Sequence, residues 1–337
     1  MPIPEGFQNY AASLGFSDSE TLGRILEILF DGDDDAIVTK AMPGAVPEIA
    51  ERCGLSETRV QKVVDKLFSR GALHRTMKRA DYFLLIPSII EFRDSTVIYW
   101  EDMPQELFEL WHKLMSKEIS PDTPIIKDNK KTPLARFIPI EETIKSENMI
   151  LDIDSARKIF SGAELISAIP CACRTVLKKN DGGENCPAPE KALCMSTNGF
   201  ARVALERGVG EQLTNTEALK RIDEAEKAGL VHVVRNNVKE DMFMCNCCSC
   251  CCAGIHFIRE LGFEANAPSR FRAEVDVDNC NACGTCEEMC MFNAIAVDSE
   301  ASIIEDKCYG CGLCVANCPE KAMSLEEVRP KESVRVS

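Results

Sequence analysis

The sequence has few of the residues and motifs on which most enzymes rely. Only 4 of its 337 residues are histidines, 2 are tryptophans, and aromatic residues make up 6%. It contains no strand-linked G-x-G-x-x-G, no Walker A loop and no nucleophile elbow, so it offers no nucleotide or acyl-transfer site that can be named. These absences leave few groups for acid–base or nucleotide-dependent catalysis.

The sequence also lacks segments that would direct it to a membrane. Residues 1–7 have neither a basic n-region nor an apolar h-region, so we expect no secretory leader. The longest apolar stretch, residues 82–90, is interrupted by Pro87 and is far shorter than the roughly 20 residues of a membrane helix. We therefore expect a cytoplasmic protein without a membrane span, whose 19 cysteines stay reduced in an anaerobic cell.

Cysteine is the abundant residue, and two cysteine runs near the C-terminus share one spacing. The pattern C-x2-C-x2-C-x3-C covers residues 280–290 and recurs over residues 308–318. This is the ligand spacing of two [4Fe–4S] clusters, in which the fourth cysteine of each run points away and serves the other cluster. We therefore expect two crossed ligand sets: Cys280, Cys283, Cys286 and Cys318 for the first cluster, and Cys308, Cys311, Cys314 and Cys290 for the second.

The residues between these cysteines repeat in the same register, with Gly284 matching Gly312 and Asp278 matching Asp306. Residues 270–330 closely resemble the bacterial two-cluster ferredoxins. The resemblance implies a fold of paired β-hairpins and short helices, and low-potential electron transfer. Disulfides or zinc would be the alternative use of these cysteines.

The charge of the chain indicates a kind of partner. The formal net charge is −15, and residues 270–330 hold twelve acidic against five basic residues. Acidic ferredoxin surfaces steer toward basic patches on redox partner proteins, so we expect such a docking patch on the partner. A soluble protein that simply carries many acids is the alternative explanation.

Residues 1–115 are predicted to form a mainly helical domain. A short helix over 47–53, a turn, and a helix over 57–69 with Ser56 as N-cap precede a hairpin of residues 70–74 and 82–85. This order resembles the winged helix-turn-helix of bacterial transcription regulators. Seven basic residues against three acidic ones over 56–82 would suit DNA, yet the whole domain holds nineteen acids against twelve bases. DNA is therefore the weaker expectation, and the domain would dock a partner or pair two copies as a homodimer.

Residues 116–269 contain ten cysteines and begin with a proline-rich stretch, residues 119–140, which we interpret as an extended connector. Idle reduced thiols oxidise or cross-link, so metal ligation explains their density. At most alternate members of the run over 245–252 are expected to face one metal, because neighbouring residues point different ways. The candidates for an additional Fe–S centre are Cys171, Cys173, Cys186, Cys194, Cys245, Cys247, Cys248, Cys251 and Cys252.

Two alternatives stay open for these middle cysteines. Zinc would need only four of them, and its usual x2-spaced knuckles are absent. Structural or redox-active thiols are the other alternative.

The whole chain resembles a group of multidomain 4Fe–4S ferredoxin-type proteins of anaerobic bacteria and archaea. The features that carry this resemblance are the winged-helix-like start, the Pro-Cys-x-Cys-Arg motif at 170–174, the cysteine run at 245–252 and the tandem repeat. It implies electron transfer and no defined substrate.

We therefore expect an α+β chain of three domains: a winged-helix-like domain (1–115), a mixed, mainly helical, cysteine-rich segment (116–269) and a two-cluster ferredoxin domain (270–330). The leading function is that of an electron carrier or electron-input subunit for a partner oxidoreductase. A redox-sensing transcription regulator, and a reductase with its active centre at the middle cysteines, are the alternatives.

Overall fold

The computed structural model describes residues 2–76, 79–98, 103–131, 133–144, 154–237, 242–262, 264 and 266–334. They form a mixed α+β structure with two compact units. The first unit comprises residues 1–128, 172–184 and 207–209, and the second comprises the remainder. The domain boundaries expected from the sequence stay predictions. No described helix has the length and apolarity that crossing a bilayer requires.

The first unit is mainly helical and has one three-stranded antiparallel sheet of order β1-β3-β2. Its elements are α1 (Gln8–Leu14), α2 (Glu20–Leu29), α3 (Asp35–Lys40), β1 (Gly44–Ala45), α4 (Val46–Cys53), α5 (Glu57–Ser69), β2 (Leu73–Arg75), β3 (Tyr82–Leu85), α6 (Ile89–Thr96), α7 (Gln105–Lys113), the π-helix η1 (Leu114–Glu118), α8 (Pro124–Lys131) and α10 (Ala172–Lys178).

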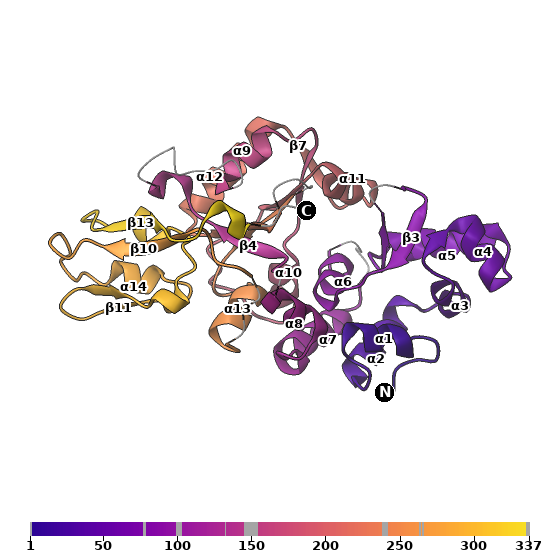
Figure 1. The fold of residues 1–337 in the computed structure, drawn as a ribbon. Coiled ribbons are helices and arrows are strands. Elements are labelled where there is room, and N and C mark those ends of the chain that lie inside the picture. Colours follow the sequence, from indigo (N-terminus) through magenta and orange to yellow (C-terminus); the bar gives the residue numbers. More distant parts are fainter. Residues whose placement is uncertain are drawn as a thin grey trace. The chain divides into compact units, whose positions relative to one another are not determined.

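The two helices and the hairpin expected over residues 47–85 are present in this unit as α4, α5, β2 and β3 (Figure 1). Ser56 caps α5 as expected, since its side chain accepts a hydrogen bond from the backbone N–H of Arg59. The winged-helix assignment itself stays a prediction.

The core of the first unit is aromatic. Phe92 of α6 packs edge-on against Tyr10 and Trp111, with ring centroids 5.6 and 5.5 Å apart. The Tyr10 hydroxyl donates a hydrogen bond to the carbonyl oxygen of Ile86, which satisfies the polar end of a buried ring. These contacts tie α1, α6 and α7 together.

The second unit is built on a six-stranded sheet of order β4-β8-β9-β6-β5-β7, in which every neighbouring pair is antiparallel. Its elements before the tandem repeat are β4 (Ala135–Ile138), the 3-10 helix η2 (Glu141–Thr143), α9 (Ala156–Ser161), β5 (Ile166–Ile169), β6 (Cys194–Thr197), α11 (Asn198–Glu206), β7 (Glu211–Leu213), α12 (Asn215–Lys227), β8 (Val231–Arg235), β9 (Phe243–Cys247) and α13 (Ala253–Arg259).

The middle segment is mixed and richer in helix than in strand, as expected, but it is organised around a sheet that was not predicted; its strands are three to five residues long and too short to give a clear alternating pattern. One expectation about this segment is wrong. Residues 119–140 are not an extended connector, because they include α8 and β4. Pro124 is the first residue of α8, a position where its missing N–H costs nothing.

The two faces of the sheet have different partners, because successive side chains of a strand point to opposite faces. Met195 and Met244 belong to an apolar cluster with residues of α9 and α12. Phe137, Val233 and Cys247 belong to another apolar cluster, which they share with the tandem repeat. The repeat therefore packs directly on the sheet.

The tandem repeat forms two antiparallel strand pairs, β10–β13 and β11–β12, with one short helix that contains the third cysteine of each run. Figure 1 shows these elements gathered at one end of the second unit, in orange to yellow. They are β10 (Phe271–Val275), α14 (Thr285–Met289), β11 (Ile295–Val297), β12 (Ala301–Ile303), the 3-10 helix η5 (Glu305–Lys307), α15 (Leu313–Ala316), β13 (Met323–Glu327) and the 3-10 helix η6 (Lys331–Ser333).

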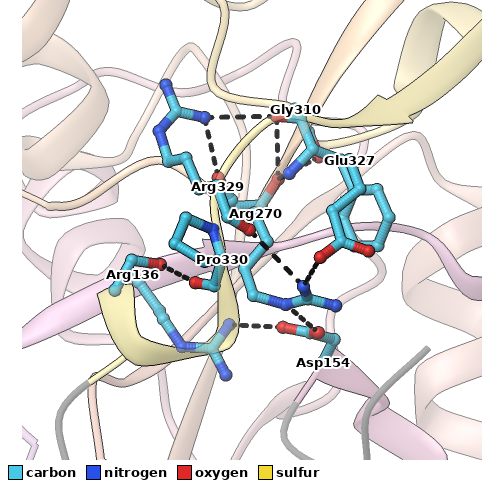
Figure 2. Close-up of polar contacts among 10 residues, drawn as sticks. Arg136, Asp154, Arg270, Gly310, Glu327, Arg329 and Pro330 are labelled. Carbon is cyan, nitrogen blue, oxygen red and sulfur yellow. Dashed lines mark hydrogen bonds and ion pairs between the residues drawn. The ribbon is translucent and has the colours of Figure 1, made fainter. Parts of the chain in front are cut away.

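A buried ionic network joins the sheet to the repeat (Figure 2). The carboxylate of Asp154 lies 3.1 Å from Nη1 of Arg136 in β4 and 2.7 Å from Nε of Arg270, which precedes β10. All three side chains are at most 2% exposed, and Arg270 also pairs with Glu327 of β13. Burial lowers the pKa of Arg136 to about 10, although Asp154 opposes this shift.

Candidate iron–sulfur and metal sites

Two cavities lie in the tandem repeat, and each is lined by four cysteines that come from both runs. Their volumes, counting the open space at their mouths, are similar, about 330 and 340 Å³. The cysteines of the first cavity are Cys280, Cys283, Cys286 and Cys318, and those of the second are Cys290, Cys308, Cys311 and Cys314. These are the two crossed sets expected from the spacing, and four thiolates per cavity are the donor set of a [4Fe–4S] cluster.

The loop around the first cavity is the more accessible one. Cys283 is exposed, and its Sγ lies 3.4 Å from the hydroxyl oxygen of Thr285, a hydrogen bond that lowers the pKa of this thiol. The backbone N–H of Ala301 donates to Sγ of Cys280 at 3.4 Å. Gly284 has φ +81°, and a Cβ atom added there would meet nothing within 4 Å. This loop is therefore free of tight packing at Gly284.

The loop around the second cavity is packed against the rest of the unit. A Cβ atom at Gly310 would lie 2.0 Å from the carbonyl oxygen of Phe271, and one at Gly312 would lie 2.4 Å from Oγ1 of Thr143 in η2. The backbone N–H of Ile140 donates to the carbonyl oxygen of Cys311. Burial raises the pKa of Cys311 to about 12. Ligands of this site are therefore held by the body of the unit.

Backbone amides and aromatic rings complete the second cavity. The N–H groups of Ala273 and Ala294 donate to Sγ of Cys308 and Cys290 at 3.4 and 3.3 Å. Phe292 and Tyr309 line the cavity, and both rings pack on Phe137 of β4, with centroids 5.0 and 5.1 Å away. Hydrogen bonds and a dry shell of this kind tune a cluster's potential.

The two sites differ at one position that can be tested. At the first site the hydroxyl of Thr285 lies 3.4 Å from Sγ of Cys283 and can donate a hydrogen bond to the thiolate that a cluster would bind, whereas its counterpart in the repeat is the apolar Leu313. We expect Thr285→Val to lower the midpoint potential of one cluster by on the order of tens of millivolts, because a hydrogen bond to a thiolate stabilises the added negative charge of the reduced state. EPR-monitored redox titration measures this shift. Leu313→Val is the matched control, and an equal shift in that variant would contradict the assignment.

Five of the middle cysteines meet on the sheet. This set, here called the sheet-face group, comprises Cys171, Cys194, Cys245, Cys247 and Cys252. The thiol of Cys194 interacts with those of Cys171 and Cys245, and the thiol of Cys247 interacts with those of Cys245 and Cys252. The thiols of this group thus follow one another in a row and do not all lie within contact distance of a single point.

Strand register explains this grouping. Met195 of β6 is paired with Met244 of β9, which sets Cys194 beside Cys245, and alternation brings Cys247 to the same face. Cys245, Cys247 and Cys252 lie in or against the apolar cluster that also contains cysteines of both cavities. The sheet-face group therefore shares a core with the tandem repeat.

A buried polar network fixes the opposite face of β9. The side chain of Asn246, between Cys245 and Cys247, donates to the carbonyl oxygen of Leu193, and its Oδ1 lies 2.6 Å from Nδ1 of His232. Both Asn246 and His232 are fully buried. These bonds hold β6, β8 and β9 in the register that aligns the cysteines.

A second set of middle cysteines converges beside the sheet. This set, here called the loop group, comprises Cys186, Cys248, Cys250 and Cys251. The Sγ atoms of Cys186 and Cys248 lie 3.5 Å apart, as do those of Cys250 and Cys251. Cys248 is buried in a small apolar cluster with Leu193, Ala225 and Leu230. Partial burial and the neighbouring Cys248 raise the pKa of Cys250 to about 12.

These positions correct the sequence-based expectation in two ways. Cys250 was not among the predicted ligands, yet it belongs to the loop group. Adjacent Cys250 and Cys251 face the same centre because residues 249–251 form a turn, in which the alternation of a strand does not apply. Cys173 lies in the first unit, where Nη2 of Arg93 is 3.2 Å from its Sγ.

The basic residues expected to face DNA are engaged by acidic neighbours. Arg59 forms two hydrogen bonds with Asp34, and Arg70 forms two with Asp31, whose pKa it holds at about 2. Lys66 bonds both Asp31 and Asp35. The acidic residues of the segment 31–35 therefore neutralise much of the positive charge of α5.

The two cavities, each lined by four cysteines, indicate an iron–sulfur protein. Comparison with known proteins agrees: residues 285–328 match the LdpA Fe-S cluster-binding domain, a family model named for that cofactor. The matched stretch includes the last two cysteines of the first run and all four of the second. No curated protein and no solved structure matches the chain.

Proposed function

We propose that this protein transfers single electrons at low potential through two [4Fe–4S] clusters. The observation that carries the proposal is the pair of cavities, each lined by three cysteines of one run and the last cysteine of the other. Bound clusters of this type supply one-electron chemistry whose potential depends on net charge, hydrogen bonds to sulfur and exposure. The fold class and donor set agree with a ferredoxin-like module in residues 270–330.

The side chains around the first cavity suit an encounter with a partner. Cys283 is exposed, and so are Glu287 and Glu288 on α14 and Glu320, which lines the cavity. An acidic rim around an accessible ligand favours a redox partner with a basic patch, because complementary charge speeds association. We propose that electrons are exchanged with the partner at this site, and that the chain serves as a carrier or as the electron-input subunit of an oxidoreductase.

We propose a third Fe–S centre at the sheet-face group. Its five thiols come from β6, β9, the residues after β5 and the N-cap of α13, which suits a polynuclear cluster, in which different irons take different thiolates. It shares an apolar core with the two cavities, and this core shields the buried cysteines of the three sites from water.

Iron and acid-labile sulfide analysis of the anaerobically purified chain tests this proposal. We expect about twelve irons per chain in the wild type and about eight in Cys194→Ser, since each cubane holds four. Cys53→Ser, a cysteine of α4 in the first unit, is the matched control and should retain all of them. Eight irons in both the wild type and Cys194→Ser would remove the third centre and leave the two-cluster proposal intact.

The geometry does not favour the DNA-binding regulator as a second function. The basic residues of α5 are paired with acidic residues of the first unit. The free energy lost by breaking those ion pairs would offset the gain from contacts with DNA phosphates.

A further inference from the structure

The loop group has a geometry that differs from that of the other cysteine sites. All four of its Sγ atoms lie within 4.8 Å of one another. Among the residues that the structure describes, no other set of three or more cysteine, histidine or acidic side chains meets this condition. The eight cysteines around the two cavities are all described, and they are therefore more widely spaced.

This spacing distinguishes a single metal ion from a cubane. Four thiolates bound at about 2.3 Å to one tetrahedral metal lie about 3.8 Å apart, and no two of them can exceed about 4.6 Å. In a cubane each thiolate binds its own iron, which moves the sulfurs farther apart. The two Sγ–Sγ distances of 3.5 Å, and the separation of at most 4.8 Å across the whole group, lie close to the geometry of one ion.

The surroundings of the loop group indicate what one ion would do there. Cys186 lies in a segment, residues 185–193, without helix or strand, and it is 62 residues away from Cys248 in the chain. The apolar cluster beneath it has only four buried members: Leu193, Ala225, Leu230 and Cys248. So small a core stabilises a long irregular segment weakly, and metal cross-links serve this purpose in small domains.

We propose that Cys186, Cys248, Cys250 and Cys251 bind one zinc ion in a closed tetrathiolate site that fastens residues 185–193 to the turn after β9. Four protein ligands leave no open position, which is the pattern of a structural rather than a catalytic zinc site. Zinc has no redox chemistry of its own, so an ion here would not carry electrons. Cys248 also belongs to a different apolar cluster from the cysteines assigned to iron, which separates the two kinds of site. The site goes beyond the proposed electron transfer and does not depend on it.

Metal analysis of the full chain, expressed with both iron and zinc in the medium, tests this inference. We expect about one zinc per chain in the wild type and in Cys53→Ser, and near zero in Cys250→Ser after a challenge with a chelator, with unchanged iron and sulfide. Cys250 is the exposed member of the group, so the variant is least expected to disturb folding. Loss of about four irons on Cys250→Ser, or about one iron and no zinc in the wild type, would overturn the proposal.

Two further readouts separate a zinc site from a general structural effect. Replacement of zinc by cobalt should give the visible absorption of a tetrahedral tetrathiolate in the wild type, and Cys186→Ser should abolish it. Limited proteolysis should cut within residues 185–193 at least tenfold faster in Cys186→Ser than in Cys53→Ser. Equal cleavage rates in these two variants would contradict the fastening role.

Discussion

Replacing Cys318 with alanine is expected to destroy the cluster held by the other run of cysteines, and not the one held by its own. Cys318 lines the cavity of Cys280, Cys283 and Cys286, whereas Cys290 lines the cavity of the second run. The number of intact [4Fe–4S] clusters, counted by EPR spin integration of the reduced chain, should therefore fall by one in Cys318→Ala.

Two double variants make this test decisive. Cys318→Ala with Cys283→Ala should lose one cluster only, because both residues serve the same site, whereas Cys318→Ala with Cys311→Ala should lose two. Effects at one shared site do not add, and effects at separate sites do. The reverse order of these two results would mean that each run binds its own cluster, and the crossed assignment would be wrong.

Replacing Asp154 with alanine is expected to have the largest effect on folding stability. Its carboxylate is fully buried between Arg136 and Arg270, and its removal leaves two guanidinium groups of the core facing each other (Figure 2). Removing one partner of a buried ion pair lowers the free energy of unfolding by about 3–5 kcal/mol. For a folding unit of about 150–250 residues this lowers the melting temperature by about 6–20 °C.

Thermal unfolding of the anaerobic protein, followed by circular dichroism, measures this loss of stability. An exposed ion pair of the second unit provides the control variant. Asp223 pairs with Arg157 at 2.6 Å, but both side chains are more than a third exposed, so Asp223→Ala should change the free energy of unfolding by about 0–1 kcal/mol. Iron content at low temperature should be the same in both variants. Equal melting temperatures would show that the buried network does not stabilise the junction between the sheet and the repeat.

Features that depend on local spacing could be predicted from this sequence, and features that depend on long-range pairing could not. The cysteines that line the two cavities are separated by gaps of two and three residues. In tight loops and short helices these gaps alone determine which thiols lie close together. Helix α5 follows in the same way from an apolar face and the Ser56 cap.

The middle cysteines could not be sorted in this way. Whether Cys194 meets Cys245 depends on the pairing of β6 with β9, strands that lie some fifty residues apart in the sequence. Cys186 joins Cys248 only because a loop returns to the sheet. Strands as short as β5 and β6 have too few alternating residues to predict a sheet, so the sequence indicates the helices of this segment but not its sheet.

Strand β9 has a consequence for how this chain could change over evolutionary time. Cys247 belongs to the sheet-face group and Cys248 to the loop group, so adjacent residues supply two different centres. A shift of one residue moves every side chain of a strand to the opposite face. A single-residue insertion or deletion within Phe243–Cys247 would therefore disturb both ligand sets at once, so this strand should tolerate substitution more readily than any change in length.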